Sequence, residues 1–183
     1  MEQRRNVEVK VVLRELRLSQ RQMVELGLVL ARHVMPIWQQ EEHFSKQRPE
    51  EALQAVEAWL RDEATLQQVQ DACALMTGFI GDMNRLAMGR PPATAVKYSA
   101  YAAADAAYAL IALSAIIGSK DDESAFEALC DVTLSTIVAK AAATALAEHQ
   151  VFESQAAQES RAAATRADVI GIIHDHFVSS TLA

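Results

Sequence analysis

The sequence predicts an all-α protein: a single-domain, multi-helix bundle around an Ala-rich antiparallel helical hairpin. Two Ala-rich stretches, residues 97–118 and 133–147, are expected to form the hairpin. Ala has the highest helix propensity, and its small side chain lets two helices approach closely. The 183 residues include only 6 Gly and 4 Pro, as is typical of helical proteins. We expect one domain over residues 1–183, with a basic N-terminal helix (1–21), a core bundle (22–150) and a C-terminal helix (151–183).

The apolar run 97–118 is long enough to raise the alternative of a transmembrane helix. Asp105 lies near its middle, where a carboxylate costs about 2.5–3.5 kcal/mol on insertion scales. The sequence therefore predicts a buried helix and no membrane partner. No apolar segment follows the first basic residues, so a signal peptide is not expected. Two cysteines within apolar helical patterns suit a reducing compartment, and we expect a cytoplasmic protein.

Helices before the hairpin are predicted from apolar spacing and from capping residues. Residues 1–21 are assigned to a helix although residues 7–11 alternate like a strand, because no second strand is available to pair with them. Ser19 is a typical N-cap for the next helix, which Pro36 should end or kink. Pro49 is expected at the first position of a third helix, and Trp59 within that helix is expected in the core.

The clearest helical pattern begins at a capping box formed by Thr65 and Gln68. Its apolar positions alternate by three and four: Leu66, Val69, Cys73, Met76, Ile80, Met83 and Ala87. Such a face packs into a bundle or mediates self-association. Residues 118–122 predict the hairpin turn, with Asp121 or Asp122 as the cap. A last apolar cluster should dock the C-terminal helix: Val169, Ile170, Ile173 and Phe177.

The chain contains none of the common catalytic or metal-binding patterns. None of its five histidines has a Glu three residues before it, as a di-iron bundle requires. His174 and His176 are two residues apart, so on a helix they point about 200° away from each other and do not form a metal site. Phosphate-binding loops, Cys-x-x-Cys and nucleophile elbows are also missing. We expect no enzyme activity, no cofactor and no metal. The net charge of −7 argues against nucleic acid as a partner.

One group of polar residues lies on a single face of the first Ala-rich helix: Tyr98, Tyr101, Asp105 and Tyr108. Tyr combines a large apolar area with a polar tip, so it is used at interfaces and in ligand pockets. The plainer alternative is a helix rim whose hydroxyls face water. Asp105 and Lys140 are lone charges within Ala-rich helices, and they either pair across the hairpin or each face solvent.

Two separated patterns carry a family resemblance: Leu30-Ala31-x-x-Val34-Met35-Pro36, and then Arg48-Pro49-x-x-Ala52-Leu53-x-Ala55-x-x-Ala58-Trp59-x-Arg61-x-Glu63. Together with the Ala-rich hairpin they resemble the immunity-protein domain of the Imm-five-like family, over residues 25–147. Asp62 stands where similar sequences often have Gly. The resemblance implies an all-helical protein of a bacterial polymorphic toxin system, which binds a cognate toxin and neutralises it.

These features favour a non-catalytic interaction protein with a protein partner. Because toxins that act on nucleic acid are usually basic, we expect an acidic partner surface that includes Glu41, Glu42, Glu50, Glu51, Asp121, Asp122 and Glu123. A first alternative is a helical domain that binds a small molecule between the tyrosines. A second is a structural subunit that self-associates through the apolar face of residues 66–87.

Overall fold

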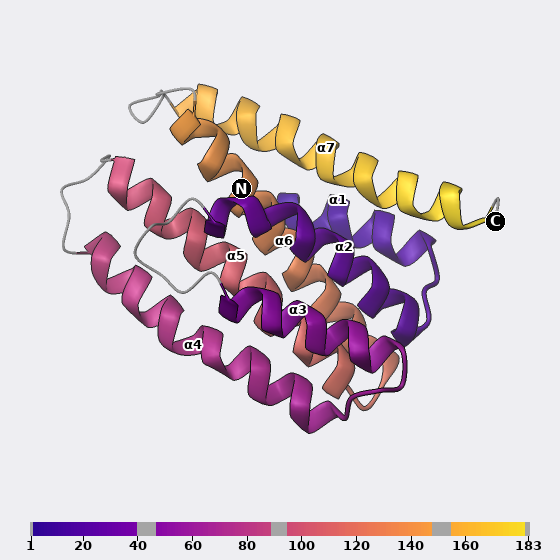
Figure 1. The fold of residues 1–183 in the computed structure, drawn as a ribbon. Helices are drawn as coiled ribbons and strands as arrows, with labels where there is room; N and C mark the ends of the chain where they lie inside the picture. Colours follow the sequence, from indigo (N-terminus) through magenta and orange to yellow (C-terminus); the bar gives the residue numbers. More distant parts are fainter. Residues whose placement is uncertain (1, 40–46, 89–94, 148–154, 182–183) are drawn as a thin grey trace.

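The computed structural model describes residues 2–39, 47–88, 95–147 and 155–181, and these form seven helices (Figure 1). In order they are α1 (Glu2–Glu15), α2 (Gln20–Gln39), α3 (Gln47–Leu60), α4 (Leu66–Met88), α5 (Ala95–Gly118), α6 (Asp122–Ala147) and α7 (Gln155–Thr181). No strand occurs within these ranges. The predicted all-α fold is confirmed, including the helical assignment of the N-terminal segment.

The Ala-rich hairpin is the centre of the bundle. Its two helices, α5 and α6, make the most extensive helix–helix contact in the described chain. α4 packs along α5, α2 lies against both helices of the hairpin, and α1 and α7 pack on α6. Figure 1 shows α7 along one edge of the bundle and α4 along the opposite edge. The hairpin therefore has neighbours on both sides, as expected for helices whose small side chains permit close packing.

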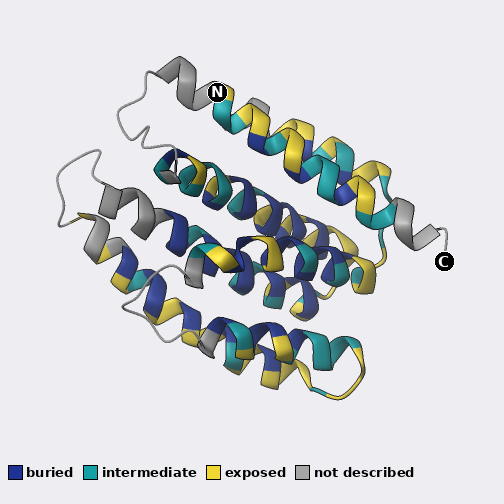
Figure 2. Cartoon of the chain, turned by 45° about the horizontal axis from the view of Figure 1, so that its top comes forward, coloured by how far each residue is buried: buried dark blue, intermediate teal, exposed yellow. Residues whose placement is uncertain are grey.

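A glycine allows α2 to approach the hairpin closely. A Cβ atom built at Gly27 would lie 2.7 Å from Cδ1 of Leu113 and 3.3 Å from Cδ1 of Ile116. The first distance is shorter than carbon–carbon contact allows, so a side chain at this position would force the Leu113 side chain to shift. One connected apolar core includes residues from all seven helices, and Figure 2 shows the buried residues on the inward faces of the helices.

Three predicted caps are confirmed by their hydrogen bonds. The Ser19 amide donates to Oε1 of Gln22 at 2.9 Å, and the Thr65 amide donates to Oε1 of Gln68 at 2.8 Å. In both pairs the backbone amide of the Gln donates back to the hydroxyl oxygen of Ser19 or Thr65, which completes a capping box. Oδ1 of Asp121 accepts from the amide of Ser124 at 2.7 Å, so Asp121 caps α6.

Pro36 does not end its helix, although an end there is one of the two outcomes that the sequence predicts for it. Pro36 lies inside α2, which continues to Gln39. Proline removes a single amide donor, and near a C-terminus few hydrogen bonds remain to be lost. Trp59 is half-buried and packs at the edge of the core rather than within it.

The end of α3 is a Schellman motif with a non-glycine residue in the left-handed position. The amide of Glu63 donates to the carbonyl of Ala58 at 2.8 Å, and the amide of Asp62 donates to the carbonyl of Trp59 at 3.0 Å. Asp62 has φ of 60°, a conformation that favours Gly. This geometry would suit Gly at the position of Asp62, as the family resemblance led us to expect.

The helix α6 is long and apolar enough, over Asp122–Leu146, to cross a membrane by length and composition alone. Within the described side chains of α5, Ala102–Gly118 forms a shorter apolar helix. α6 is contacted by α1, α2, α5 and α7, which is the environment of a central bundle helix.

Candidate partner-binding surface

The tyrosine face of α5 is described in part. Tyr108 is 45% exposed, and Asp105, one turn before it, is half-buried. Tyr98 and Tyr101 belong to α5, but their side chains lie outside the described residues. The structure therefore places Asp105 and Tyr108 on one side of α5, as the spacing predicts.

Tyr108 borders an open groove that runs along the seam between α5 and α6. The groove has a volume of about 370 Å³. Its described lining consists of Tyr108, Ile111, Ala112 and Ala115 from α5 and Asp131, Leu134 and Ser135 from α6. Val138, one turn beyond Leu134, is 49% exposed. In its described part the site is an open surface feature rather than a closed pocket for a small molecule.

Asp105 and Lys140 do not form the pair that the sequence left open. The ammonium group of Lys140 instead pairs with the carboxylate of Asp168 on α7. Lys140 lies nine residues after Asp131, which is half a turn around the axis of α6, so it faces away from the groove. Asp105 has no ion pair within the described ranges, and burial raises its pKa to about 6.

A second carboxylate lies at the groove on α6. Asp131 is exposed, yet partial burial raises its pKa and the negative charge of Glu127 raises it further, while the positive charge of Lys10 opposes both. Glu127 itself pairs with Lys10 of α1. Asp131 forms no ion pair with any side chain that the structure describes.

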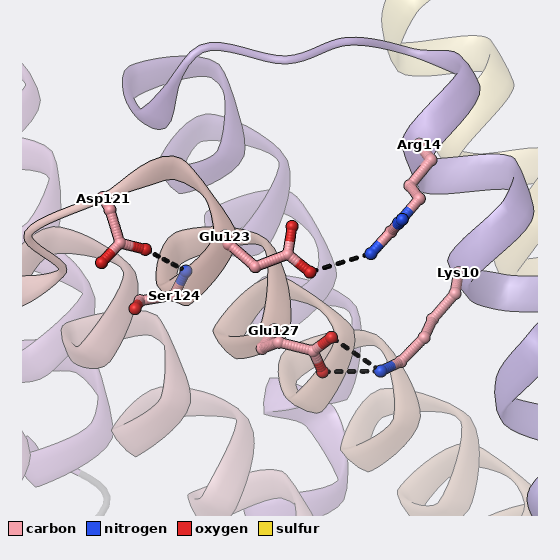
Figure 3. A network of polar contacts seen from close by, with 6 residues as sticks. All are labelled: Lys10, Arg14, Asp121, Glu123, Ser124 and Glu127. Atoms are coloured by element: carbon pink, nitrogen blue, oxygen red, sulfur yellow. Dashed lines mark hydrogen bonds and ion pairs between the residues drawn. The ribbon is translucent and has the colours of Figure 1, made fainter.

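Part of the predicted acidic surface lies where the basic helix α1 docks (Figure 3). Nη2 of Arg14 lies 2.8 Å from Oε1 of Glu123, and the Arg14 guanidinium lies 4.9 Å from the centroid of the Phe126 ring. Asp121 caps α6, and its hydrogen bonds with Ser124 lower its pKa. Asp122 is exposed. α1 therefore partly neutralises the acidic start of α6.

The remaining acidic candidates lie elsewhere. Glu50 and Glu51 are in the first turns of α3, and Glu41 and Glu42 lie outside the described residues. The guanidinium of Arg21 donates to the carbonyl of Leu60, which places the far end of α3 near the start of α2. Gln20, beside Arg21, donates to the carbonyl of Ser119 at 3.1 Å. Glu50 and Glu51, at the start of α3, are about 15 Å from its far end at Leu60. The described acidic residues of α3 and those at the start of α6 therefore form separate patches.

The apolar face of residues 66–87, predicted as a self-association face, is buried within the bundle. Five of its positions are buried in the common core: Val69, Cys73, Met76, Ile80 and Met83. Leu66 is exposed, and the side chain of Ala87 is not described. The alternative in which this face mediates self-association is therefore wrong, because α3 and α5 already cover it.

Other groups that carry chemistry are spread over the molecule. Burial raises the pKa of the Cys73 thiol to about 11 and that of Cys130 to about 12, which disfavours their reactive thiolate forms. Among the residues that the structure describes, no three His, Cys, Asp or Glu side chains lie close enough together to hold a metal ion. His174 is exposed, and the ring of His176 packs edge-on against Phe177 with centroids 5.2 Å apart.

Comparison with known families gives a match over part of the chain. Residues 16–79 match the family described as "Imm-5 like putative immunity protein". The matched range covers α2, α3 and the first part of α4, and it contains both sequence patterns on which the resemblance rests. The Ala-rich hairpin, which the resemblance also included, lies outside it. No curated protein and no solved structure matches the chain significantly.

Proposed function

We propose that this protein is a non-catalytic, cytoplasmic immunity protein that binds a cognate bacterial protein toxin and neutralises it. The match of residues 16–79 to a family described as immunity proteins carries the proposal. Immunity proteins act by occupying a toxin, so the relevant chemistry is surface complementarity rather than turnover.

The surface features of the bundle support a protein partner. The groove between α5 and α6 is open, and Tyr108 at its border is 45% exposed. Tyrosine is enriched at protein interfaces, and an open apolar groove suits a protein segment better than an enclosed small molecule. The net charge of −7 favours a basic partner.

The test begins with the genes that flank this one. Each is expressed alone and together with this protein in a bacterial host, and growth is measured. We expect one neighbour to arrest growth and co-expression to restore it. The purified pair should form a stable complex by size-exclusion chromatography. If no neighbour is toxic, or if growth is not restored, the proposal is wrong.

Titration of the toxin's activity with this protein tests whether the effect is catalytic. Binding alone predicts full neutralisation at one equivalent and proportionally less below it. Complete neutralisation by a small fraction of an equivalent would instead indicate an enzyme that modifies or degrades the toxin.

A further inference from the structure

The groove between α5 and α6 has the form of a helix-binding site. Its walls are rows of side chains three and four residues apart on two antiparallel helices, with Tyr108 on one and Leu134 on the other. Rows with this spacing accept the ridge of a third helix between them. Tyr108 and Val138 are 45% and 49% exposed, so large apolar groups at the seam remain in contact with solvent. Helix-in-groove recognition uses such apolar anchors.

The charged residues in the two helix segments that border the groove have a single sign. Residues 105–115 and 131–138 contain no Lys, Arg or His, and their only charged side chains are Asp105 and Asp131. Elsewhere on α6 the carboxylates of Glu123 and Glu127 are already paired with α1. Neither Asp105 nor Asp131 forms an ion pair within the described ranges, although the charge of Lys10 on α1 lowers the pKa of Asp131. An incoming segment therefore meets an apolar surface with two carboxylates available to it.

The spacing of the two carboxylates specifies the partner further. Asp105 lies 13 residues before Gly118, where α5 ends, and Asp131 lies nine residues after Asp122, where α6 begins. The two positions therefore differ by about four residues along the antiparallel helices, a rise of about 6 Å or one helical turn. Basic residues at positions i and i+4 of a helix lie on one face at the same separation. Burial raises the pKa of both carboxyl groups, so a nearby cation would favour their ionised forms.

We propose that the α5–α6 groove binds an amphipathic helix of the partner protein, with apolar anchors against Tyr108 and Leu134 and basic residues one turn apart facing Asp105 and Asp131. This inference rests on the proposed function and names the contact surface for it. The groove lies outside the matched range of residues 16–79, so it can differ between proteins that share that range and select the partner.

The groove is tested first with a defined probe, a fluorescein-labelled, amidated peptide of sequence LKKLLKLLKKLLKL, by fluorescence anisotropy. Lys at its second and sixth positions provides the required spacing. We expect Val138→Lys and Asp131→Lys each to weaken binding at least about tenfold, equivalent to about 1.4 kcal/mol. The matched controls are Leu75→Lys, which replaces an apolar residue 46% exposed on α4, and Glu51→Lys on α3. Both should bind like the parent protein.

Two further measurements decide whether the binding is specific. The peptide with Glu in place of every Lys should not bind, and amide NMR shifts caused by the Lys peptide should concentrate in residues 105–115 and 131–138. Binding equal for both peptides, binding unaffected by the groove substitutions, or shifts concentrated elsewhere would each overturn the inference. Sedimentation data showing that a second copy of this chain binds through the groove would also overturn the inference.

Repeating the titrations with the cognate toxin separates this inference from the proposed function. If the parent protein neutralises the toxin and both groove variants do so with unchanged affinity, the immunity function stands and the groove assignment is wrong. If no toxin is neutralised but the peptide binds in the groove as described, the immunity function is wrong and the groove remains a site for basic amphipathic helices. Both proposals are supported if the groove variants lose peptide binding and toxin neutralisation while the control variants keep both.

Discussion

Lys10 of α1 and Glu127 of α6 lie 117 positions apart in the sequence and form a two-pronged ion pair. Nζ of Lys10 is 2.8 Å from Oε1 of Glu127 and 2.6 Å from Oε2 (Figure 3). One turn further along α1, Arg14 pairs with Glu123. The basic character of the first helix is therefore used within the chain, where it orients α1 on α6.

Reversing the charges on α1 should loosen this helix specifically. With Lys10→Glu and Arg14→Glu, like charges face Glu127 and Glu123, so we expect faster amide hydrogen exchange over residues 7–15. Exchange in α3 and α4 should stay unchanged, since neither packs on α1. Adding Glu123→Lys and Glu127→Lys should restore protection. Failure of this charge swap to rescue α1 would show that the two pairs do not orient it.

Asp105 should make stability depend on pH. Burial raises its pKa from 3.8 to about 6 in the folded protein. Between these values the folded state binds more protons than the unfolded state, so this group lowers stability as pH rises from about 4 to 6, and the loss is complete above that range. A difference of about two pKa units corresponds to about 3 kcal/mol. Asp105→Asn should therefore stabilise the protein more at about pH 7.5 than at about pH 5.

Urea unfolding at both pH values measures this effect. The control is Asp175→Asn on α7, because Asp175 is exposed. The same pH-dependent gain in both variants, or no gain for Asp105→Asn, would show that the burial of Asp105 carries no such cost.

Lys140 should couple energetically to Asp168 and not to Asp105. A double-mutant cycle with Lys140→Met and Asp168→Asn should give a coupling energy of about 0.2–1 kcal/mol, the range for partly exposed ion pairs. The cycle with Asp105→Asn should give zero within error. A larger coupling with Asp105 would require Lys140 to face the seam between α5 and α6.

Asp62→Gly should stabilise the protein. Asp62 has φ of 60°, where an L-residue is strained by about 1–2 kcal/mol and Gly is not. The exposed ion pair of Asp62 with Arg21, at 3.5 Å, offsets little of this gain. Asp62→Ala is the control, because Ala loses the same ion pair but keeps the Cβ atom. Equal denaturation midpoints for Gly and Ala would contradict strain at this cap.

Two glycines should respond oppositely to alanine. Gly78 lies within α4, and a Cβ atom there would meet nothing within 4 Å, so Gly78→Ala should stabilise by about 0.5–1 kcal/mol through helix propensity. At Gly27 the same change places a methyl group 2.7 Å from Leu113 in the core. We expect Gly27→Ala to destabilise by about 1–3 kcal/mol, the usual cost of overpacking. Thermal or chemical denaturation of both variants shows the sign.

Features that depend on neighbouring residues were predictable from the sequence. Ser19, Thr65 and Asp121 cap helices as expected, because a cap bonds to amides two or three positions away. The Ala-rich hairpin was predictable for the same reason, since helix propensity and a short turn are properties of adjacent residues. Pro36 shows a limit of this reasoning, because the effect of a proline depends on its distance from the helix end.

The partner of each side chain was decided by the tertiary structure. Lys140 pairs with Asp168 rather than Asp105, and the apolar face of residues 66–87 is buried rather than exposed. Both follow because packing sets how each helix is rotated about its axis. The sequence by itself determined that this chain is a helical bundle around an Ala-rich pair and that Asp105 shares a face with Tyr108. Only the tertiary structure decided that this face opens, with Asp131, on a groove, since that requires side chains from two helices to meet across a seam.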